Sequence, residues 1–186
     1  MYEDHFNRIP ENKDAEMRPY QAKDIPVLCA MAEKFVPEMP SYIGITVDKD
    51  RFAYLLRHHE KNSQSFAGWV LVDENDLPIG LIGGTISPSF LSHDKIANDS
   101  WLFVLPGWRT MKNGNKLVSA YKSWALKMGA TLIRGSCSGG YRPEEMRAFM
   151  KRNGFELVGD LFHIRTDQTT LVKQLNALKG LSNVGS

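Results

Sequence analysis

The side-chain pattern changes from helical to β-type after residue 65, and this change limits the fold more than any other feature of the chain. Residues 66–73 (FAGWVLVD) and 79–87 (IGLIGGTIS) are rich in branched, aromatic and small residues, and the turn sequence ENDLP separates them. Two such runs joined by a short turn predict an antiparallel hairpin. Residues 98–104 (NDSWLFV) predict a third strand, and residues 131–136 (TLIRGS) predict another after an intervening helix. A hairpin that continues into a strand–helix–strand unit predicts a mixed sheet.

Helical segments surround these strands. In residues 22–35 (AKDIPVLCAMAEKF) Asp24 is the expected N-cap and Pro26 falls in the first turn, where its missing N–H costs least. The other expected elements are a strand at 17–21, helices at 47–60, 116–129 and 143–155, and a closing strand or strand pair at 155–166. The predicted fold class is therefore α/β, with a mixed, mostly antiparallel sheet and helices on both faces.

The chain has 186 residues, which is the size of one domain with short terminal segments. Residues 1–15 show no hydrophobic periodicity and predict a flexible, extended or disordered arm. The domain spans residues 16–167. The remaining residues, 168–186, predict an amphipathic tail that packs on the body.

Composition narrows the function classes. Lys and Arg total 23 against 21 Asp and Glu, a net charge of +2, which argues against a nucleic-acid partner. No apolar run reaches the roughly 20 residues that span a bilayer, so we expect no membrane partner. The polar, mixed-charge N-terminus resembles neither a signal nor a transit peptide, which favours a cytoplasmic location. The two cysteines, Cys29 and Cys137, form neither a disulfide framework nor a zinc motif, and we expect no metal.

The loop at residues 104–114 (VLPGWRTMKNG) carries the strongest functional signal. It joins a predicted strand to a predicted helix, where unpaired N–H groups and the helix dipole favour an anion such as a phosphate. Arg109, Lys112 and Gly114 make this corner more attractive to an anion. The alternative is an ordinary polar turn between strand and helix.

This loop resembles the strand-to-helix signature of the GCN5-related N-acetyltransferase (GNAT) superfamily, Val-x-Pro-x-x-Arg/Gln-x-x-Gly-x-Gly/Ala. Val104, Pro106, Arg109 and Gly114 match at the correct spacing, while Lys112 occupies the first glycine position. Asn153, Gly154 and Phe155 resemble the family's closing helix and following strand, and the resemblance extends from Met17 to about Arg165. Small proteins of this kind resemble some encoded by bacteriophages, including virion-associated ones, so a divergent phage-encoded member, in the host cytoplasm or the virion, is one hypothesis for the origin of the chain.

The resemblance implies a GNAT-like sheet with a splayed parallel strand pair, and acetyl-CoA as co-substrate. The backbone of Phe103 and Val104 would pair with the pantetheine arm, and Arg109 would add a positive charge near the pyrophosphate. The N–H groups that would face the pyrophosphate belong to Thr110, Met111, Lys112, Asn113, Gly114 and Asn115. The acceptor would be an amine on a small molecule or a protein, and it would attack the thioester directly. The oligomeric state stays open.

The chain departs from the family pattern at the acid that protonates the thiolate. The family's usual Tyr on the last helix is replaced by Met150, whose thioether cannot donate a proton. Tyr141 is the best substitute, with Ser136 and Ser138 nearby. Asp99 and Glu38 are the candidate bases. Residues 36–46 and 88–96 are expected to line the acceptor side, with Tyr42, Phe90 and Trp108 as aromatic contacts.

Two hypotheses therefore remain. One is an N-acyltransferase that moves an acetyl group from acetyl-CoA to an amine. The other is a catalytically inactive protein of the same fold that binds a partner or serves as a structural, virion-associated component. Met150, Lys112 and the two terminal segments favour the second. A nucleotide-binding module of another fold is excluded because neither GxxxxGK[ST] nor GxGxxG occurs.

Overall fold

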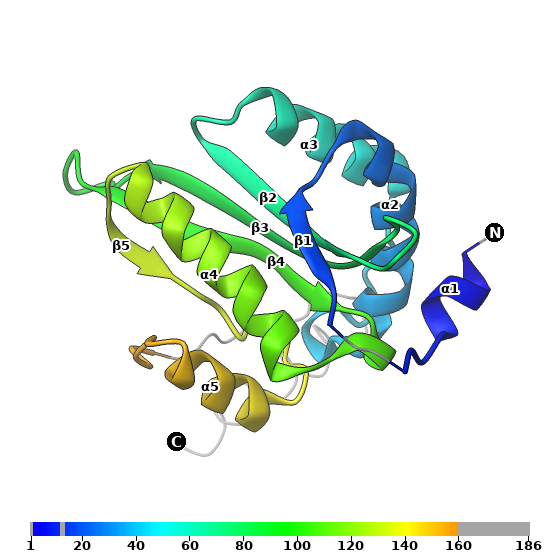
Figure 1. Ribbon diagram of the computed structural model, residues 1–186. Coiled ribbons are helices and arrows are strands. Elements are labelled where there is room, and N and C mark those ends of the chain that lie inside the picture. Colours follow the sequence, from blue (N-terminus) through cyan, green and yellow to red (C-terminus); the bar gives the residue numbers. More distant parts are fainter. Residues whose placement is uncertain (1, 12–13, 160–186) are drawn as a thin grey trace, which may run out of the picture.

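The computed structural model describes residues 2–11 and 14–159. Its centre is a five-stranded sheet in the order β1-β2-β3-β4-β5 (Figure 1). The strands are β1 (Glu16–Pro19), β2 (Phe66–Val72), β3 (Pro78–Pro88), β4 (Lys95–Val104) and β5 (Ala130–Arg134). Neighbouring strands are antiparallel except β4 and β5, which are parallel. The mixed, mostly antiparallel sheet expected from the sequence is confirmed.

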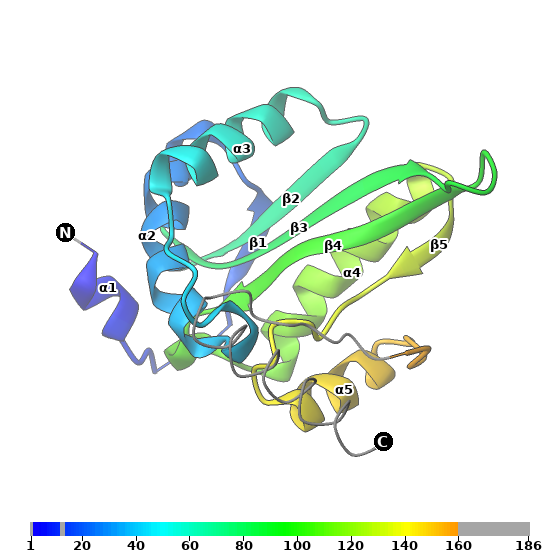
Figure 2. The ribbon, with the colours of Figure 1, turned by 180° about the vertical axis from the view of Figure 1, so that it is seen from behind.

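Helices cover both faces of this sheet. The α-helices are α1 (Glu3–Asn7), α2 (Ile25–Phe35), α3 (Lys49–Lys61), α4 (Met111–Lys127) and α5 (Pro143–Arg152). Short 3-10 turns are η1 (Ala22–Asp24), η2 (Val36–Glu38), η3 (Pro40–Tyr42) and η4 (Pro106–Trp108). Helices α2 and α3 lie on one face and α4 on the other, as the front and rear views show (Figures 1 and 2). None of the helices in the described part of the chain is long and apolar enough to span a bilayer.

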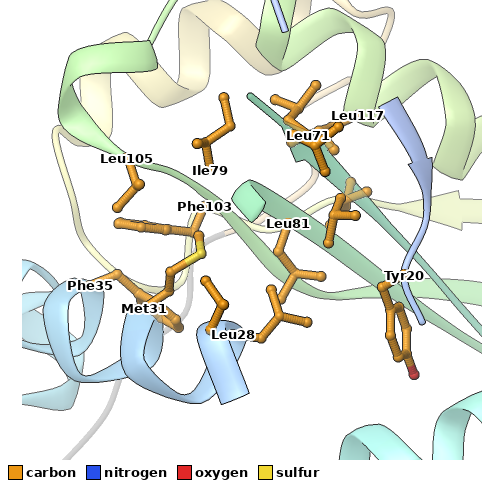
Figure 3. Packing of buried hydrophobic residues seen from close by; sticks show 14 of the residues in the cluster. Tyr20, Leu28, Met31, Phe35, Leu71, Ile79, Leu81, Phe103, Leu105 and Leu117 are labelled. Atoms are coloured by element: carbon orange, nitrogen blue, oxygen red, sulfur yellow. The ribbon is translucent and has the colours of Figure 1, made fainter. Parts of the chain in front are cut away.

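Apolar stripes on α2 and α4 explain why these helices pack on the sheet. The apolar face expected on α2 is buried: Ile25, Leu28, Cys29, Met31, Ala32 and Phe35. On α4 the buried residues are Leu117, Val118, Tyr121 and Ala125. Figure 3 shows Leu28, Met31 and Phe35 packing toward Leu81 and Phe103 of the sheet. Burial of this apolar area, at about 25 cal/mol per Å², is the main driving force for the assembly.

Two adjacent glycines in β3 let large aromatic side chains pack directly on the sheet. A Cβ on Gly83 would lie 2.5 Å from the Trp101 ring, and a Cβ on Gly84 would lie 2.6 Å from the Tyr121 ring. Adjacent strand residues face opposite sides, so Trp101 lies on the α3 side and Tyr121 on the α4 side. The pairing is Gly83↔Trp101 and Gly84↔Asp99, which leaves Ser100 as an extra residue in β4. This bulge puts Asp99 and Trp101 on opposite faces of the sheet.

The N-terminal segment differs from the expected extended or disordered arm. Residues Glu3–Asn7 form α1, and Phe6 is buried against the body. The backbone of Arg8 lies so close to η4 that a Cβ on Gly107 would be 2.4 Å from the Arg8 carbonyl oxygen. The short polar sequence hides this contact because a single apolar anchor, Phe6, does not produce a periodic pattern.

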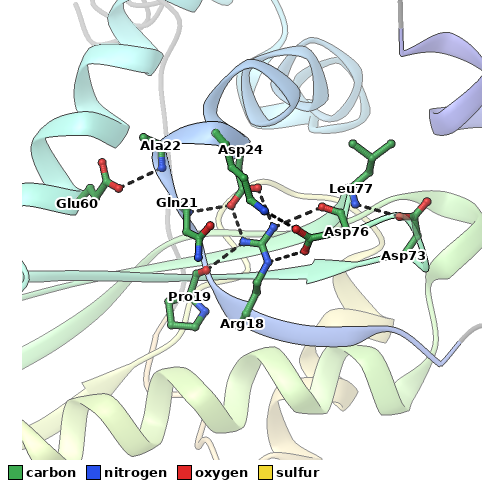
Figure 4. Close-up of polar contacts among 10 residues, drawn as sticks. Arg18, Pro19, Gln21, Ala22, Asp24, Glu60, Asp73, Asp76 and Leu77 are labelled. Carbon is green, nitrogen blue, oxygen red and sulfur yellow. Dashed lines mark hydrogen bonds and ion pairs between the residues drawn. The ribbon is translucent and has the colours of Figure 1, made fainter.

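A charged cluster joins β1, η1 and the turn between β2 and β3 (Figure 4). The Arg18 guanidinium donates to both carboxylate oxygens of Asp24, at 2.7 and 2.9 Å, and its Nε donates to Asp76 at 2.7 Å. Asp24 precedes α2 as expected, but its side chain makes no capping hydrogen bond to that helix. Instead it accepts from the Gln21 N–H at 2.8 Å, because η1 turns the carboxylate back toward β1.

Some helix ends lie where the sequence predicts them, and others do not. Gly129 and Gly154 have φ of +77° and +83°, which fits their expected positions after α4 and α5. Helix α4 starts five residues before the expected start at 116, because Thr110 caps it. Residues 155–159 contain no strand. The rest of the expected closing strand, with His163, and the expected tail at 168–186 lie outside the described residues.

Candidate functional site

The parallel strands β4 and β5 separate along their length. Their pairing runs from Lys95↔Ala130 to Asn98↔Arg134 and ends there, although β4 continues to Val104. A cavity of about 400 Å³ occupies the opening. Its walls come from the second half of β4, from residues 136–142, from the start of α4, from α5 and from the α2–η3 segment. Because β4 keeps only β3 as a neighbour here, its backbone on the β5 side is available to a ligand.

Close packing on both sides holds the chain after β5 away from β4. A Cβ on Gly135 would lie 2.1 Å from the Met150 methyl group, so α5 presses directly on this residue. Farther along, Ser41 in η3 donates its hydroxyl to the Ser138 carbonyl at 2.6 Å and its N–H to the Gly139 carbonyl at 3.2 Å. The divergence of the two strands is therefore built into the packing of α5 and η3.

The first turn of α4 opens into the same cavity. The Thr110 side chain caps the helix by accepting from the Asn113 N–H at 3.2 Å, and its carbonyl accepts from the Gly114 N–H at 3.1 Å. Met111 and Lys112 are the first two residues of α4, so their N–H groups have no partner within the helix. A Cβ on Gly114 would meet the Phe149 ring at 2.9 Å, so only glycine leaves this wall open. Two free amides and a helix dipole make the corner favourable for an anion.

Arg109 connects three walls of the cavity. Its Nε donates to the Val104 carbonyl at 2.7 Å, its Nη1 to the Tyr141 hydroxyl at 2.5 Å, and its Nη2 to the Glu38 carboxylate at 2.8 Å. The guanidinium also lies 5.2 Å from the centre of the Phe103 ring and 4.8 Å from that of Tyr141. Such a planar group, fixed by hydrogen bonds and rings, places a positive charge at a defined point.

Asp99 lies at the narrow end of the cavity, across from Ser136. The Ser136 hydroxyl donates to the Asp99 carboxylate at 3.4 Å, and burial raises the pKa of Asp99 above its ordinary value. Cys137 also lines this end. Burial, and then the charge of Asp99, raise the pKa of the Cys137 thiol, which keeps it protonated and a poor nucleophile. The described residues contain no group of His, Cys, Asp and Glu that could hold a metal ion.

Solved structures with the same architecture include acetyltransferases. Glucosamine-6-phosphate N-acetyltransferase from Arabidopsis thaliana is 15% identical, with a TM-score of 0.66 over 83% of this chain and 99% of that one. A GCN5-related N-acetyltransferase from Ralstonia eutropha is 19% identical, with a TM-score of 0.65 over 83% of this chain and all of the other. The protein has the GNAT fold. No family model and no curated protein matches the sequence.

A third structure with this fold contains acetyl-CoA. It is a predicted acetyltransferase from Clostridium acetobutylicum with acetyl-CoA, 15% identical, with a TM-score of 0.62 over 82% of this chain and 96% of that one. Identities this low establish the fold, and the function of this GNAT-fold chain has to be argued from its own cavity.

The structure brings most of the expected site residues to this cavity. Those that line it are Asp99, Phe103, Val104, Arg109, Thr110, Met111, Gly114 and Tyr141. The side chains of three others make contacts elsewhere. Lys112 forms an ion pair with Asp14 at 2.5 Å, and Asn115 accepts from the Asn153 amide at 3.0 Å. Asn113 is fully buried, donating to the Trp108 carbonyl at 2.9 Å and accepting from the Ala15 N–H.

Of the two segments expected on the acceptor side, one lines the cavity and the other does not. Glu38, Met39 and Tyr42 line the cavity, as expected for residues 36–46. Residues 88–96 do not line it; Phe90 is 94% exposed at the tip of the β3–β4 hairpin. Trp108, the last residue of η4, is buried in the core and does not line the cavity. Met150, expected at the position of the GNAT family's usual Tyr, packs against Gly135 and is absent from the residues that line the cavity.

Several lining residues were missed by the sequence analysis. Met146 and Phe149 from α5 and Phe35 from the end of α2 form apolar walls. The sequence does carry a signal for Met146 and Phe149, because their spacing from Arg142 and from each other puts all three on one helical face. This spacing indicates a shared surface, but it does not say whether that surface faces the core or a ligand.

Proposed function

We propose that this protein transfers an acetyl group from acetyl-CoA to a primary amine by direct attack of the amine on the thioester. The observation that carries the proposal is the opening between β4 and β5, which ends at the free amides of the α4 first turn. An extended arm with a diphosphate at one end has the shape of this space. Acetyl-CoA has those two parts in that order.

The residues of the cavity fit such a molecule. The backbone of Phe103 and Val104 would pair with the pantetheine amides, and the Val104 carbonyl keeps one lone pair because Arg109 uses only one. The amides of Met111 and Lys112 would bind the diphosphate, with the guanidinium groups of Arg109 and Arg142 on the same cavity wall. Gly114 leaves room for the diphosphate beside Phe149.

The proposed reaction needs two proton transfers. A carboxylate accepts one proton of the ammonium, the neutral nitrogen then bonds to the thioester carbon, and the carbon–sulfur bond breaks to release the thiolate. The thiolate takes up a proton as the nitrogen loses its second one. Asp99 supports the first role because burial raises its pKa toward the working pH of the reaction. Tyr141 supports the second, since its hydroxyl accepts from Arg109 and so keeps its own proton to donate. The products are an acetamide and coenzyme A.

Met150 supports a second candidate, a catalytically inactive protein that binds the same ligand. It occupies the position of the family's acid, cannot donate a proton, and packs on Gly135 instead of lining the cavity. In this case Tyr141 would serve only to orient Arg109.

Two measurements separate these candidates. Titration of the protein with acetyl-CoA by calorimetry tests binding, and at about a hundredfold excess over the dissociation constant the ligand should stabilise the fold by roughly 2.7 kcal/mol. Release of free thiol from acetyl-CoA across a panel of amines, including glucosamine 6-phosphate, polyamines and lysine peptides, tests turnover. Binding with thiol release supports the transferase, and binding without it supports the inactive protein. A protein that binds neither acetyl-CoA nor coenzyme A contradicts both.

A further inference from the structure

The side of the cavity next to α2 is lined by apolar and aromatic side chains. Phe35 and Phe103 pack with ring centres 4.8 Å apart, and Met39 extends this surface from the segment between η2 and η3. Trp101 continues it along β4, where Phe52 packs edge-on against the Trp101 ring at 5.2 Å. We call Phe35, Met39, Tyr42, Trp101 and Phe103 the apolar wall. All five line the cavity, and none of them offers a charge to a ligand.

The apolar wall continues onto the surface instead of ending at the cavity mouth. Tyr42 is 42% exposed, and two further apolar side chains of the same segment, Ile43 and Ile45, are 60% and 62% exposed. Large apolar side chains that lie together on a surface and lead into a pocket mark a binding region for apolar groups. A ligand body that follows this path is apolar over most of its length.

The charges in the cavity are arranged to attract a cation. In the part of the chain that the structure describes, the carboxylates that line the cavity are Glu38 in η2, Asp99 at the narrow end and Glu145 on α5. Among the described residues, the positively charged side chains that line the cavity are Arg109 and Arg142. Arg109 pairs with Glu38 at 2.8 Å, and Arg142 is the N-cap residue of α5. On the α2 side Glu38 already pairs with Arg109, so a negative group on the acceptor would have to compete with the Glu38 carboxylate for that guanidinium.

Resting on the proposed acetyl transfer, we propose that the acceptor is a primary amine on an apolar aryl or alkyl body that carries no negative group. The ammonium is drawn to the carboxylates, and the body packs along the apolar wall toward Tyr42. After the proton leaves the nitrogen, the neutral amine attacks the thioester and the acetyl group passes to it. Coenzyme A leaves as the thiol.

Three acceptors test this assignment with acetyl-CoA at saturation and thiol release as the measurement. 2-Phenylethylamine has the expected body, ethylamine lacks the ring, and phenylalanine adds a carboxylate to the same ring and amine. We expect kcat/KM for 2-phenylethylamine to exceed that of either other compound by about tenfold or more, since burying a ring and avoiding a like charge are each worth at least that factor. Equal or reversed values would overturn the assignment.

A matched pair of variants locates the effect. Tyr42→Ala removes part of the apolar wall and should lower kcat/KM for 2-phenylethylamine by about five- to tenfold, a typical effect of losing one aromatic contact. Tyr54→Ala removes an aromatic side chain on α3 that is 66% exposed and does not line the cavity, and it should change nothing. Both residues are surface-exposed, so both variants should keep the melting temperature of the wild type.

The affinity for acetyl-CoA, measured by calorimetry without an amine, distinguishes a failure of the acceptor assignment from a failure of the proposed acetyl transfer. If acetyl-CoA binds and phenylalanine or a lysine peptide is the better acceptor, the assignment of the acceptor fails and the proposed function stands. If acetyl-CoA does not bind, or binds without transfer to any amine, the proposed function fails and the acceptor assignment with it.

Discussion

Gly114 is the residue at which the sequence signature and the cavity geometry meet. A side chain here would point at Phe149 across the wall that is proposed to face the diphosphate. We expect Gly114→Glu to weaken acetyl-CoA binding by at least about tenfold, because the carboxylate fills the space and repels the diphosphate. The backbone of α4 should tolerate the change, since a non-glycine residue with negative charge near a helix N-terminus is favourable, while the Phe149 ring has to shift to admit the new Cβ.

Calorimetric titration of Gly114→Glu with acetyl-CoA measures this effect. Gly159→Glu is the control, because a Cβ at Gly159 meets nothing within 4 Å and the variant adds the same charge away from the cavity. Equal affinities of the two variants would mean that the first turn of α4 does not bind the co-substrate.

Asp99 should show opposite effects on stability and activity. Its pKa is raised by burial, so its contribution to stability is fully present at low pH and is lost as the pH rises through the pKa of the folded state. Asp99→Asn cannot ionise. We therefore expect its melting temperature to exceed that of the wild type at pH 8 and to show no such advantage at pH 4.

Turnover of Asp99→Asn should fall by roughly a hundredfold or more, the usual effect of removing a general base. Thermal unfolding at the two pH values and thiol release at pH 8 give both quantities. A variant that keeps full turnover would leave Glu38 as the candidate base, and a variant that is less stable at pH 8 would mean that Ser136 stabilises the carboxylate more than burial disfavours it.

For single residues, the sequence predicts backbone positions better than it predicts the roles of side chains. The match at Val104, Pro106, Arg109 and Gly114 places the end of β4 correctly, whereas α4 begins five residues before the expected start at 116. It does not reveal that Asn113 is buried, since its partner, Ala15, lies 98 residues earlier in the chain. A polar residue in the first turn of a helix is usually exposed, whereas here contacts with Ala15 and Trp108 bury the Asn113 side chain.

Among the elements, the strands and long helices were predictable because their apolar residues repeat at the period of the structure. The bulge at Ser100 was not predictable from the sequence, although it puts Asp99 and Trp101 on opposite faces of the sheet. The adjacent glycines Gly83 and Gly84 are its only local sign, and they can be interpreted only when Trp101 and Tyr121 are known to pack on them. The splay of β5 likewise depends on α5 and η3, which contact the chain after β5 from distant positions.

Helix α1 connects the N-terminus to the loop that precedes α4. Phe6 is 7% exposed, and α1 packs against η4. We expect Phe6→Ala to lower the free energy of unfolding by about 2–4 kcal/mol, as for other large-to-small changes at buried positions. Ile9→Ala, at a side chain that is 76% exposed, should change it by less than about 0.5 kcal/mol.

Urea unfolding of the two variants provides the measurement, with amide hydrogen exchange over residues 105–114 as a second readout. If α1 supports the loop, Phe6→Ala speeds exchange there and Ile9→Ala does not. Equal stabilities of the two variants would show that α1 contributes nothing to the folded body.

Across the whole molecule, ion pairs tie the N-terminal third of the chain to distant elements. Glu3 pairs with Lys34, Asp14 pairs with Lys112 and Lys116, and Asp76 pairs with Arg18 and Lys23. In each case the positive partner lowers the pKa of the carboxyl group. A lowered pKa stabilises the fold above the pKa of the unfolded chain, and this contribution is lost as the pH falls. The attachment of the N-terminal third should therefore weaken in acid.

Asp76 allows a test of this acid sensitivity at the contact between β1 and the β2–β3 turn, since Arg18 and Lys23 lower its pKa to about 2. As the pH falls from 5 to 2 the wild type should lose the contribution of this carboxylate, whereas Asp76→Asn has none to lose, so the gap between their melting temperatures should narrow. Asn also tolerates the left-handed backbone at this position, where φ is 59°, so the turn itself is preserved. At 1 M salt, where the Debye length is about 3 Å, the gap should already be small at pH 5. A gap that is constant over the pH range would mean that the hydrogen bonds of Asp76, and not its charge, join β1 to the β2–β3 turn.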